Sequence, residues 1–123
     1  MLNKSTLFFF AITWTVLITF LSLVTIGSFG SNIPIPNNDN IVHLVLYFGF
    51  VVLWSWYKNK SNYTKKIGIT ILFVAIAYGI LMELLQHFTT TRSPDCYDIL
   101  ANSIGAFIGL LFANKIFLNK RKI

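Results

Sequence analysis

The stretch "IGITILFVAIAYGILMELLQHF", residues 67–88, decides what kind of protein this sequence encodes. Among its residues only Glu83 is formally charged at neutral pH. A helix of about 20 apolar residues crosses the ~30 Å hydrocarbon core of a bilayer, so the stretch predicts a membrane-spanning helix. The stretch also raises a question, because such a helix has an evident reason to exclude a carboxylate.

Three further apolar stretches extend the same prediction along the chain, at residues 7–27, 41–57 and 94–117. Of the 123 residues, 55% are hydrophobic and 11% are charged, a composition that excludes an ordinary water-soluble surface. The first stretch is longer than the apolar core of a secretory signal, which favours an uncleaved anchor. We therefore predict an all-α fold, a four-helix transmembrane bundle that forms a single domain over residues 1–123.

The basic residues predict how the bundle is oriented. Nine of the ten lie at Lys4, within residues 58–66 or within residues 115–122. Basic segments stay on the cytoplasmic side. The chain is therefore expected in a bacterial cytoplasmic membrane, with both termini on the cytoplasmic side. The net charge of +6 then reflects topology and contact with the anionic headgroups of the lipid bilayer, and we expect no nucleic-acid partner.

The acidic residues lie towards the opposite side. All four of them, together with both histidines and Arg92, fall in or next to the two predicted outer loops: Asp39, Glu83, Asp95 and Asp98. The ionisable groups that could carry chemistry are therefore expected on the outer side of the membrane.

Helical spacing places several polar residues on shared faces. His43 and Tyr47 are four residues apart, and Glu83 and Gln86 are three apart, so each pair shares one face of its helix. A third face runs through residues 95, 98, 102, 105 and 109 at spacings of 3, 4, 3 and 4. Its inner half is the GxxxG pair Gly105 and Gly109, which permits close approach of another helix.

Three spans bring polar residues to a similar depth. At 1.5 Å per residue, His43, Glu83 and Asn102 each lie within about 15 Å of their outer helix ends. A charged side chain at the centre of the bilayer costs at least ~2.5 to 3.5 kcal/mol, and such residues normally face a partner inside the bundle. We therefore expect Glu83 to meet Arg92, His43 or Asn102 in a pocket open to the outside.

These residues also carry a family resemblance. The segments "DNIVHLVLY" (39–47) and "ELLQHFTTTRSPDCYDILANSIGAFIG" (83–109) resemble the VanZ-like family of small bacterial integral membrane proteins, over about residues 37–112. The resemblance implies a role in the cell envelope, since the founding member is associated with resistance to the glycopeptide antibiotic teicoplanin. It implies no defined reaction. The matching positions are Asp39, His43, Tyr47, Glu83, Gln86, Arg92, Ser93, Asp98, Asn102 and Gly105.

The first hypothesis is an outward-facing pocket that recognises or modifies a lipid-linked or peptidoglycan-related molecule. His43 and Glu83 would be catalytic and move protons, and Arg92 would bind an anionic group. Other residues would complete the ligand-binding site: Asp39, Tyr47, Gln86, Asp98 and Asn102. We expect no cofactor and no metal site, because the available donors, His43, Glu83, His87 and Asp98, form no diagnostic metal signature.

Two alternatives belong to other classes. A small multidrug transporter would place its site near the midplane, whereas the polar residues of this chain stop in the outer half. A structural or assembly subunit would use the same polar residues only to lock helices together. The sequence leaves open whether the protein is an enzyme and what its oligomeric state is.

Overall fold

The computed structural model describes residues 3–23, 38–89 and 96–118, without the side chains of residues 23, 38–40, 86, 87, 89 and 96. The described residues form α1 (Lys4–Leu23), α2 (Asn38–Asn59), α3 (Lys65–Thr89), α4 (Cys96–Ala113) and a π-helical turn, η2 (Asn114–Leu118). They include no strand. The all-α, four-helix prediction is therefore confirmed.

Each of the four α-helices is long and apolar enough to cross a membrane, over Lys4–Ser22, Ile41–Asn59, Lys65–Leu85 and Tyr97–Leu118. Large apolar side chains face outwards along them, as shown by Phe9, Phe73 and Phe88, which are 64%, 65% and 80% exposed. A water-soluble protein would bury such rings, whereas lipid tails solvate them. The chain is a multi-pass membrane protein.

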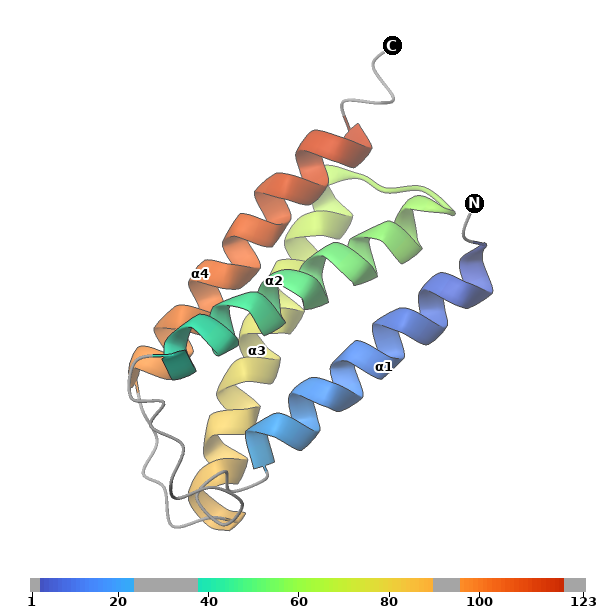
Figure 1. The fold of residues 1–123 in the computed structure, drawn as a ribbon. Helices are drawn as coiled ribbons and strands as arrows, with labels where there is room; N and C mark the ends of the chain where they lie inside the picture. Colours follow the sequence, from blue (N-terminus) through green and yellow to red (C-terminus); the bar gives the residue numbers. More distant parts are fainter. Residues whose placement is uncertain (1–2, 24–37, 90–95, 119–123) are drawn as a thin grey trace.

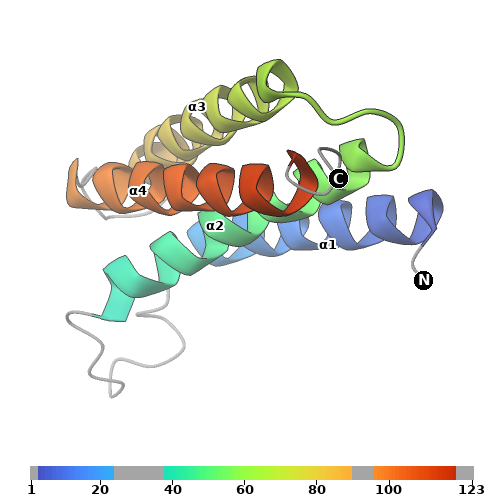
Figure 2. The ribbon, with the colours of Figure 1, turned by 90° about the horizontal axis from the view of Figure 1, so that it is seen from above.

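The helices alternate in direction, and α2 lies between α1 and α4, with α3 packed against the same group (Figures 1 and 2). One end of the bundle contains the start of α2, the end of α3 and the start of α4; we call it the polar end. The other, the basic end, contains the start of α1, the α2–α3 connection and η2. All lysines among the described residues lie at the basic end: Lys4, Lys58, Lys60, Lys65, Lys66 and Lys115.

Close packing of α2 on α4 depends on two glycines. A Cβ atom at Gly105 would collide with the backbone carbonyl of Leu44, and one at Gly109 would lie 2.9 Å from the carbonyl oxygen of Phe48. Only residues without a side chain permit this approach of two helix backbones. The predicted role of the GxxxG pair is confirmed, and the approach sets α2 residues directly against the first turns of α4.

The core lies along the middle of the bundle. Tyr47, Phe50 and Val51 of α2 pack with Ala106 and Leu110 of α4 in the main buried cluster. Near the basic end, a smaller cluster forms around the buried ring of Tyr63, whose hydroxyl donates a hydrogen bond of 2.7 Å to Asn114 Oδ1. The two clusters pack the helices together and so fix the positions of the residues at the polar end.

Candidate functional site

Polar side chains from α2, α3 and α4 are buried together at the polar end. His43 comes from α2, Glu83 from α3, and Asp98 and Asn102 from α4. Their exposed fractions are 6%, 2%, 1% and 2%, respectively. Because buried ionisable groups are costly in an apolar bundle, this set, which we call the polar cluster, is the leading candidate for a functional site.

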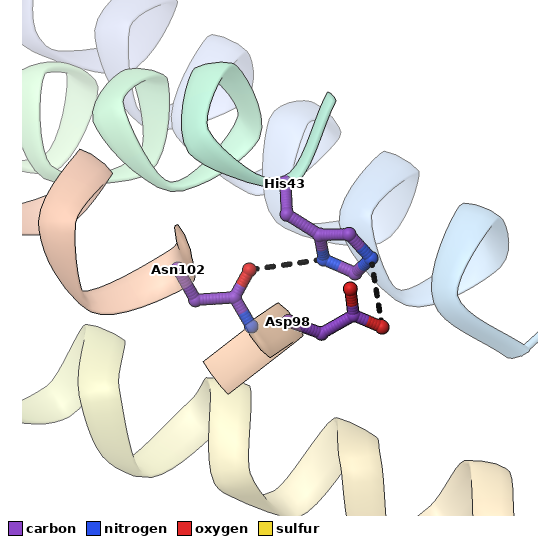
Figure 3. A network of polar contacts seen from close by, with 3 residues as sticks. All are labelled: His43, Asp98 and Asn102. Carbon is purple, nitrogen blue, oxygen red and sulfur yellow. Dashed lines mark hydrogen bonds and ion pairs between the residues drawn. The ribbon is translucent and has the colours of Figure 1, made fainter. Parts of the chain in front are cut away.

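The imidazole of His43 is held by Asn102. Its Nδ1 atom lies 2.9 Å from the amide oxygen Oδ1 of Asn102 (Figure 3). An amide oxygen can only accept, so Nδ1 carries the proton and donates it to this bond. In the neutral imidazole the lone pair is therefore on Nε2, on the other side of the ring.

That second nitrogen faces Asp98. His43 Nε2 lies 3.7 Å from Asp98 Oδ2, a separation longer than a hydrogen bond but within the range of an ion pair (Figure 3). Asp98 and Asn102 are four residues apart on α4, so consecutive turns of one helix contact opposite sides of the ring. The orientation of His43 is therefore set by α4.

Glu83 brings the second carboxylate to the cluster. His43, Glu83 and Asp98 each offer one ligand atom, a ring nitrogen or a carboxylate oxygen, and these atoms all lie within 4.8 Å of one another. Two carboxylates at this separation in a low-dielectric site repel each other and favour the uptake of a proton or another cation. The cluster therefore has the chemistry either to exchange protons or to bind a cation.

Tyr47 and Gly79 close the cluster on its inner side. The Tyr47 side chain is 0% exposed and lies one turn after His43. A Cβ atom at Gly79 would lie 3.0 Å from Asn102 Nδ2 and 3.3 Å from Tyr47 Cε2. Gly79 thus leaves room for Asn102 and Tyr47 to pack against α3, which places them beside the helix that carries Glu83.

The structure brings together five of the eight residues that the sequence suggested for the site, namely His43, Tyr47, Glu83, Asp98 and Asn102. Asp39 and Gln86 lie in the first turn of α2 and the last turns of α3, but their side chains lie outside the described part of the chain. Arg92 and Ser93 also lie outside it, so the expected contact between Glu83 and Arg92 stays a prediction.

The pairing within the cluster could not be read from the sequence. Spacing along a helix shows which residues share a face, and it correctly grouped Asp98 with Asn102 and His43 with Tyr47. It carries no signal that Asn102, rather than Asp39 or Tyr47, would bind the imidazole. That choice follows from the contact of α2 with α4 at Gly105.

Comparisons with known proteins agree with the resemblance noted in the sequence. The family description VanZ/LLP1 matches residues 4–118, a longer range than the 37–112 that the motifs suggested. An uncharacterized protein of the fission yeast Schizosaccharomyces pombe is 32% identical over 117 residues, covering 93% of this chain and 70% of that protein. No solved structure gives a significant match. Because the yeast relative is eukaryotic, the family is not confined to bacteria, but the match over almost the whole length is decisive: this chain belongs to the VanZ/LLP1 family.

Proposed function

We propose that this chain is a bacterial cell-envelope protein whose polar cluster recognises or modifies an anionic lipid-linked molecule on the outer side of the cytoplasmic membrane. The observation that carries the proposal is the burial of His43, Glu83 and Asp98, from three different helices, at one end of an apolar bundle. Membership of the VanZ/LLP1 family supports a role in the envelope, including tolerance of glycopeptides such as teicoplanin.

Energetics favour a function over a purely structural role. A charged side chain at the centre of a membrane helix costs at least ~2.5 to 3.5 kcal/mol and less towards its ends, and apolar residues of similar volume often stabilise a fold as well as buried ion pairs do. A bundle selected only for stability has no need of an imidazole and two carboxylates in one place. Their presence supports a site that acts on a ligand.

The geometry suggests separate roles for the members of the cluster. His43 and Glu83 are the groups that act on the ligand, while Asn102 and Asp98 orient the imidazole from both sides. Tyr47 packs against the inner side of the polar cluster. Three residues proposed from the sequence alone complete the ligand contacts, with Arg92 binding the anionic group: Asp39, Gln86 and Arg92.

The lipid-linked class of ligand is favoured over a peptidoglycan-specific one. The yeast relative aligns with 93% of this chain, although fungal cell walls contain no peptidoglycan. Lipids that carry a phosphate or a sugar occur in the membranes of both kinds of organism. A buried cluster inside the span of a helical bundle also suits a ligand that reaches it from the bilayer.

The test is complementation of a deletion strain, read by lipid profiling and by growth in teicoplanin. Wild-type protein should restore both the lipid profile and the tolerance. Glu83→Gln and His43→Gln should restore neither while reaching wild-type levels in the membrane. Ser103→Ala is the matched control, because Ser103 follows Asn102 on α4 but, within the described part of the chain, its hydroxyl bonds only the Ile99 carbonyl one turn earlier, at 2.9 Å.

Two results would oppose the proposal. If Glu83→Gln and His43→Gln both complement fully, the polar cluster has no part in the function. If both variants disappear from the membrane while Ser103→Ala persists, the cluster serves to lock the helices, and the structural alternative replaces the proposal.

A further inference from the structure

We infer that His43, Glu83 and Asp98 together bind one divalent transition-metal ion, of the zinc or manganese type. This inference deepens the proposed function, because it concerns the same cluster. It also reverses the expectation of no metal site drawn from the sequence, in which these residues form no local metal motif, because the fold brings them together from three helices.

The distances within the cluster suit an ion better than a direct hydrogen bond. Nitrogen and oxygen ligands about 2.1 Å from one tetrahedral zinc ion lie roughly 3.4 Å from each other. His43 Nε2 and Asp98 Oδ2 are 3.7 Å apart, and His43, Glu83 and Asp98 each offer one ring nitrogen or carboxylate oxygen within 4.8 Å of those of the other two.

The tautomer of His43 is the one that a metal requires. Because Nδ1 donates its proton to Asn102 Oδ1, the lone pair of the neutral ring lies on Nε2, the atom that faces Asp98. Metal-bound histidines almost always donate their other ring N–H to a carboxylate or carbonyl oxygen in this way. Asn102 therefore has the position of a residue that orients a metal ligand.

The charges of the donors match a divalent ion. Two ionised carboxylates carry two negative charges, and a neutral imidazole adds none. One divalent cation neutralises the set, which lowers the cost of holding it within the membrane. An imidazole favours zinc and similar transition metals, whereas carboxylates also suit manganese, so the mixed set points to these two ions.

A further polar group lies beside the cluster. The Tyr47 side chain is 0% exposed, and its hydroxyl makes no hydrogen bond with any part of the chain that the structure describes. It follows His43 by one turn of α2. A hydroxyl in this position is suited to bind an oxygen atom held near the three ligands, such as that of a water molecule or a phosphate group.

Three protein ligands leave at least one coordination position of such an ion open. An ion held there would supply a positive charge for an oxygen of a phosphate group, the anionic group expected of a lipid-linked ligand. His43, Glu83 and Asp98 would then share one task, which is to hold the ion beside the ligand.

The test is metal binding by the full-length protein purified in detergent, stripped with a chelator and titrated with ZnCl2 or MnCl2. Wild-type protein should bind about one ion per chain. Glu83→Gln and Asp98→Asn should each weaken binding by more than ~100-fold, and Asn102→Leu by about 10- to 100-fold, as expected for a residue that orients a ligand. Ser103→Ala should bind as tightly as wild type.

A second variant distinguishes loss of a metal ligand from loss of the fold. Asp98→Cys, made in a Cys96→Ser background, replaces a carboxylate ligand by a thiolate. When titrated with CoCl2 it should show the absorption of cobalt–thiolate charge transfer, which requires direct ligation at position 98. Absence of this absorption in a protein that retains its helical circular dichroism would count against the site.

The results separate this inference from the proposed function. If wild-type protein binds neither metal, or binds one only after Arg92→Gln, the cluster is neutralised by protons or by the arginine and the metal inference is wrong. A change of lipid profile in the Glu83→Gln strain would leave the proposed function standing in that case. If metal binding is lost in the ligand variants while lipid profile and tolerance are unchanged, the site stands and the proposed function fails.

Discussion

The imidazole of His43 lies between two side chains of α4: Nδ1 is 2.9 Å from Asn102 Oδ1, and Nε2 is 3.7 Å from Asp98 Oδ2. Both contacts depend on how closely the backbones of α2 and α4 approach each other. The two backbones pack tightly where Gly105 meets the carbonyl of Leu44, one residue after His43. The polar cluster and the glycine contact therefore depend on the same packing of α2 on α4. Substitutions in either of them test that packing.

Gly105→Ala should destabilise the bundle by about 1 to 3 kcal/mol, because the new methyl group would collide with a backbone carbonyl that cannot rotate away. Thermal unfolding in detergent, followed by circular dichroism, measures the loss. Ser103→Ala on the same helix is the control. A Gly105→Ala variant as stable as the control would contradict the close packing of α2 on α4.

His43 and Asn102 should be energetically coupled. In a double-mutant cycle of His43→Leu, Asn102→Leu and the double variant, we expect a coupling free energy of about 0.5 to 3 kcal/mol, since each single change leaves the other buried polar group without this bond. The free energy of unfolding of chelator-treated protein provides the measurement. Additive effects of the two substitutions would show that the bond contributes nothing to stability.

Tyr63→Phe should destabilise the basic end by about 1 kcal/mol, because it removes the hydrogen bond to Asn114 Oδ1. Burial raises the pKa of the Tyr63 hydroxyl above its ordinary value of 10.0. A raised pKa means that the folded state favours the protonated hydroxyl. The contribution of the Tyr63 hydroxyl to the free energy of unfolding is therefore complete below pH 10. It is lost as the pH rises through the pKa of Tyr63 in the folded protein.

The measurement is the free energy of unfolding as a function of pH, compared between wild type and Tyr63→Phe. Wild type should lose more stability than the variant on the alkaline side, so the two curves converge there. Tyr57→Phe is the control, because it makes the same chemical change on a ring that is only partly buried. Parallel curves for wild type and Tyr63→Phe would contradict the predicted linkage.

The orientation of the bundle also makes a prediction. A fluorescent reporter that folds only in the cytoplasm should be active when fused to either terminus, because the basic residues lie at the end of the bundle where α1 begins and η2 ends. A reporter inserted at residues 90–95 should be inactive. The opposite pattern would place the polar cluster on the cytoplasmic side and would exclude an outward-facing site.

Much of the architecture followed from local properties of the chain. Four apolar stretches predicted four helices, and the structure places the ends of α2 and α3 within three residues of the predicted spans 41–57 and 67–88. Spacings of three and four residues identified the faces that carry Glu83, Asp98 and Asn102. Hydropathy and helical period depend only on residues that are near one another in the chain, so they can be read from the sequence without the fold.

The sequence by itself determined that this is a membrane protein with four helices, that its acidic residues gather towards one side, and that Gly105 and Gly109 offer a contact face. Only the tertiary structure decided that Asn102 holds the His43 ring and that Glu83 and Asp98 come within reach of the same imidazole. The physical reason is that such contacts depend on the rotation of each helix about its axis and on the distance between axes. Both are set by packing between residues far apart in the chain, as at Gly105 and Leu44, and no local pattern encodes them.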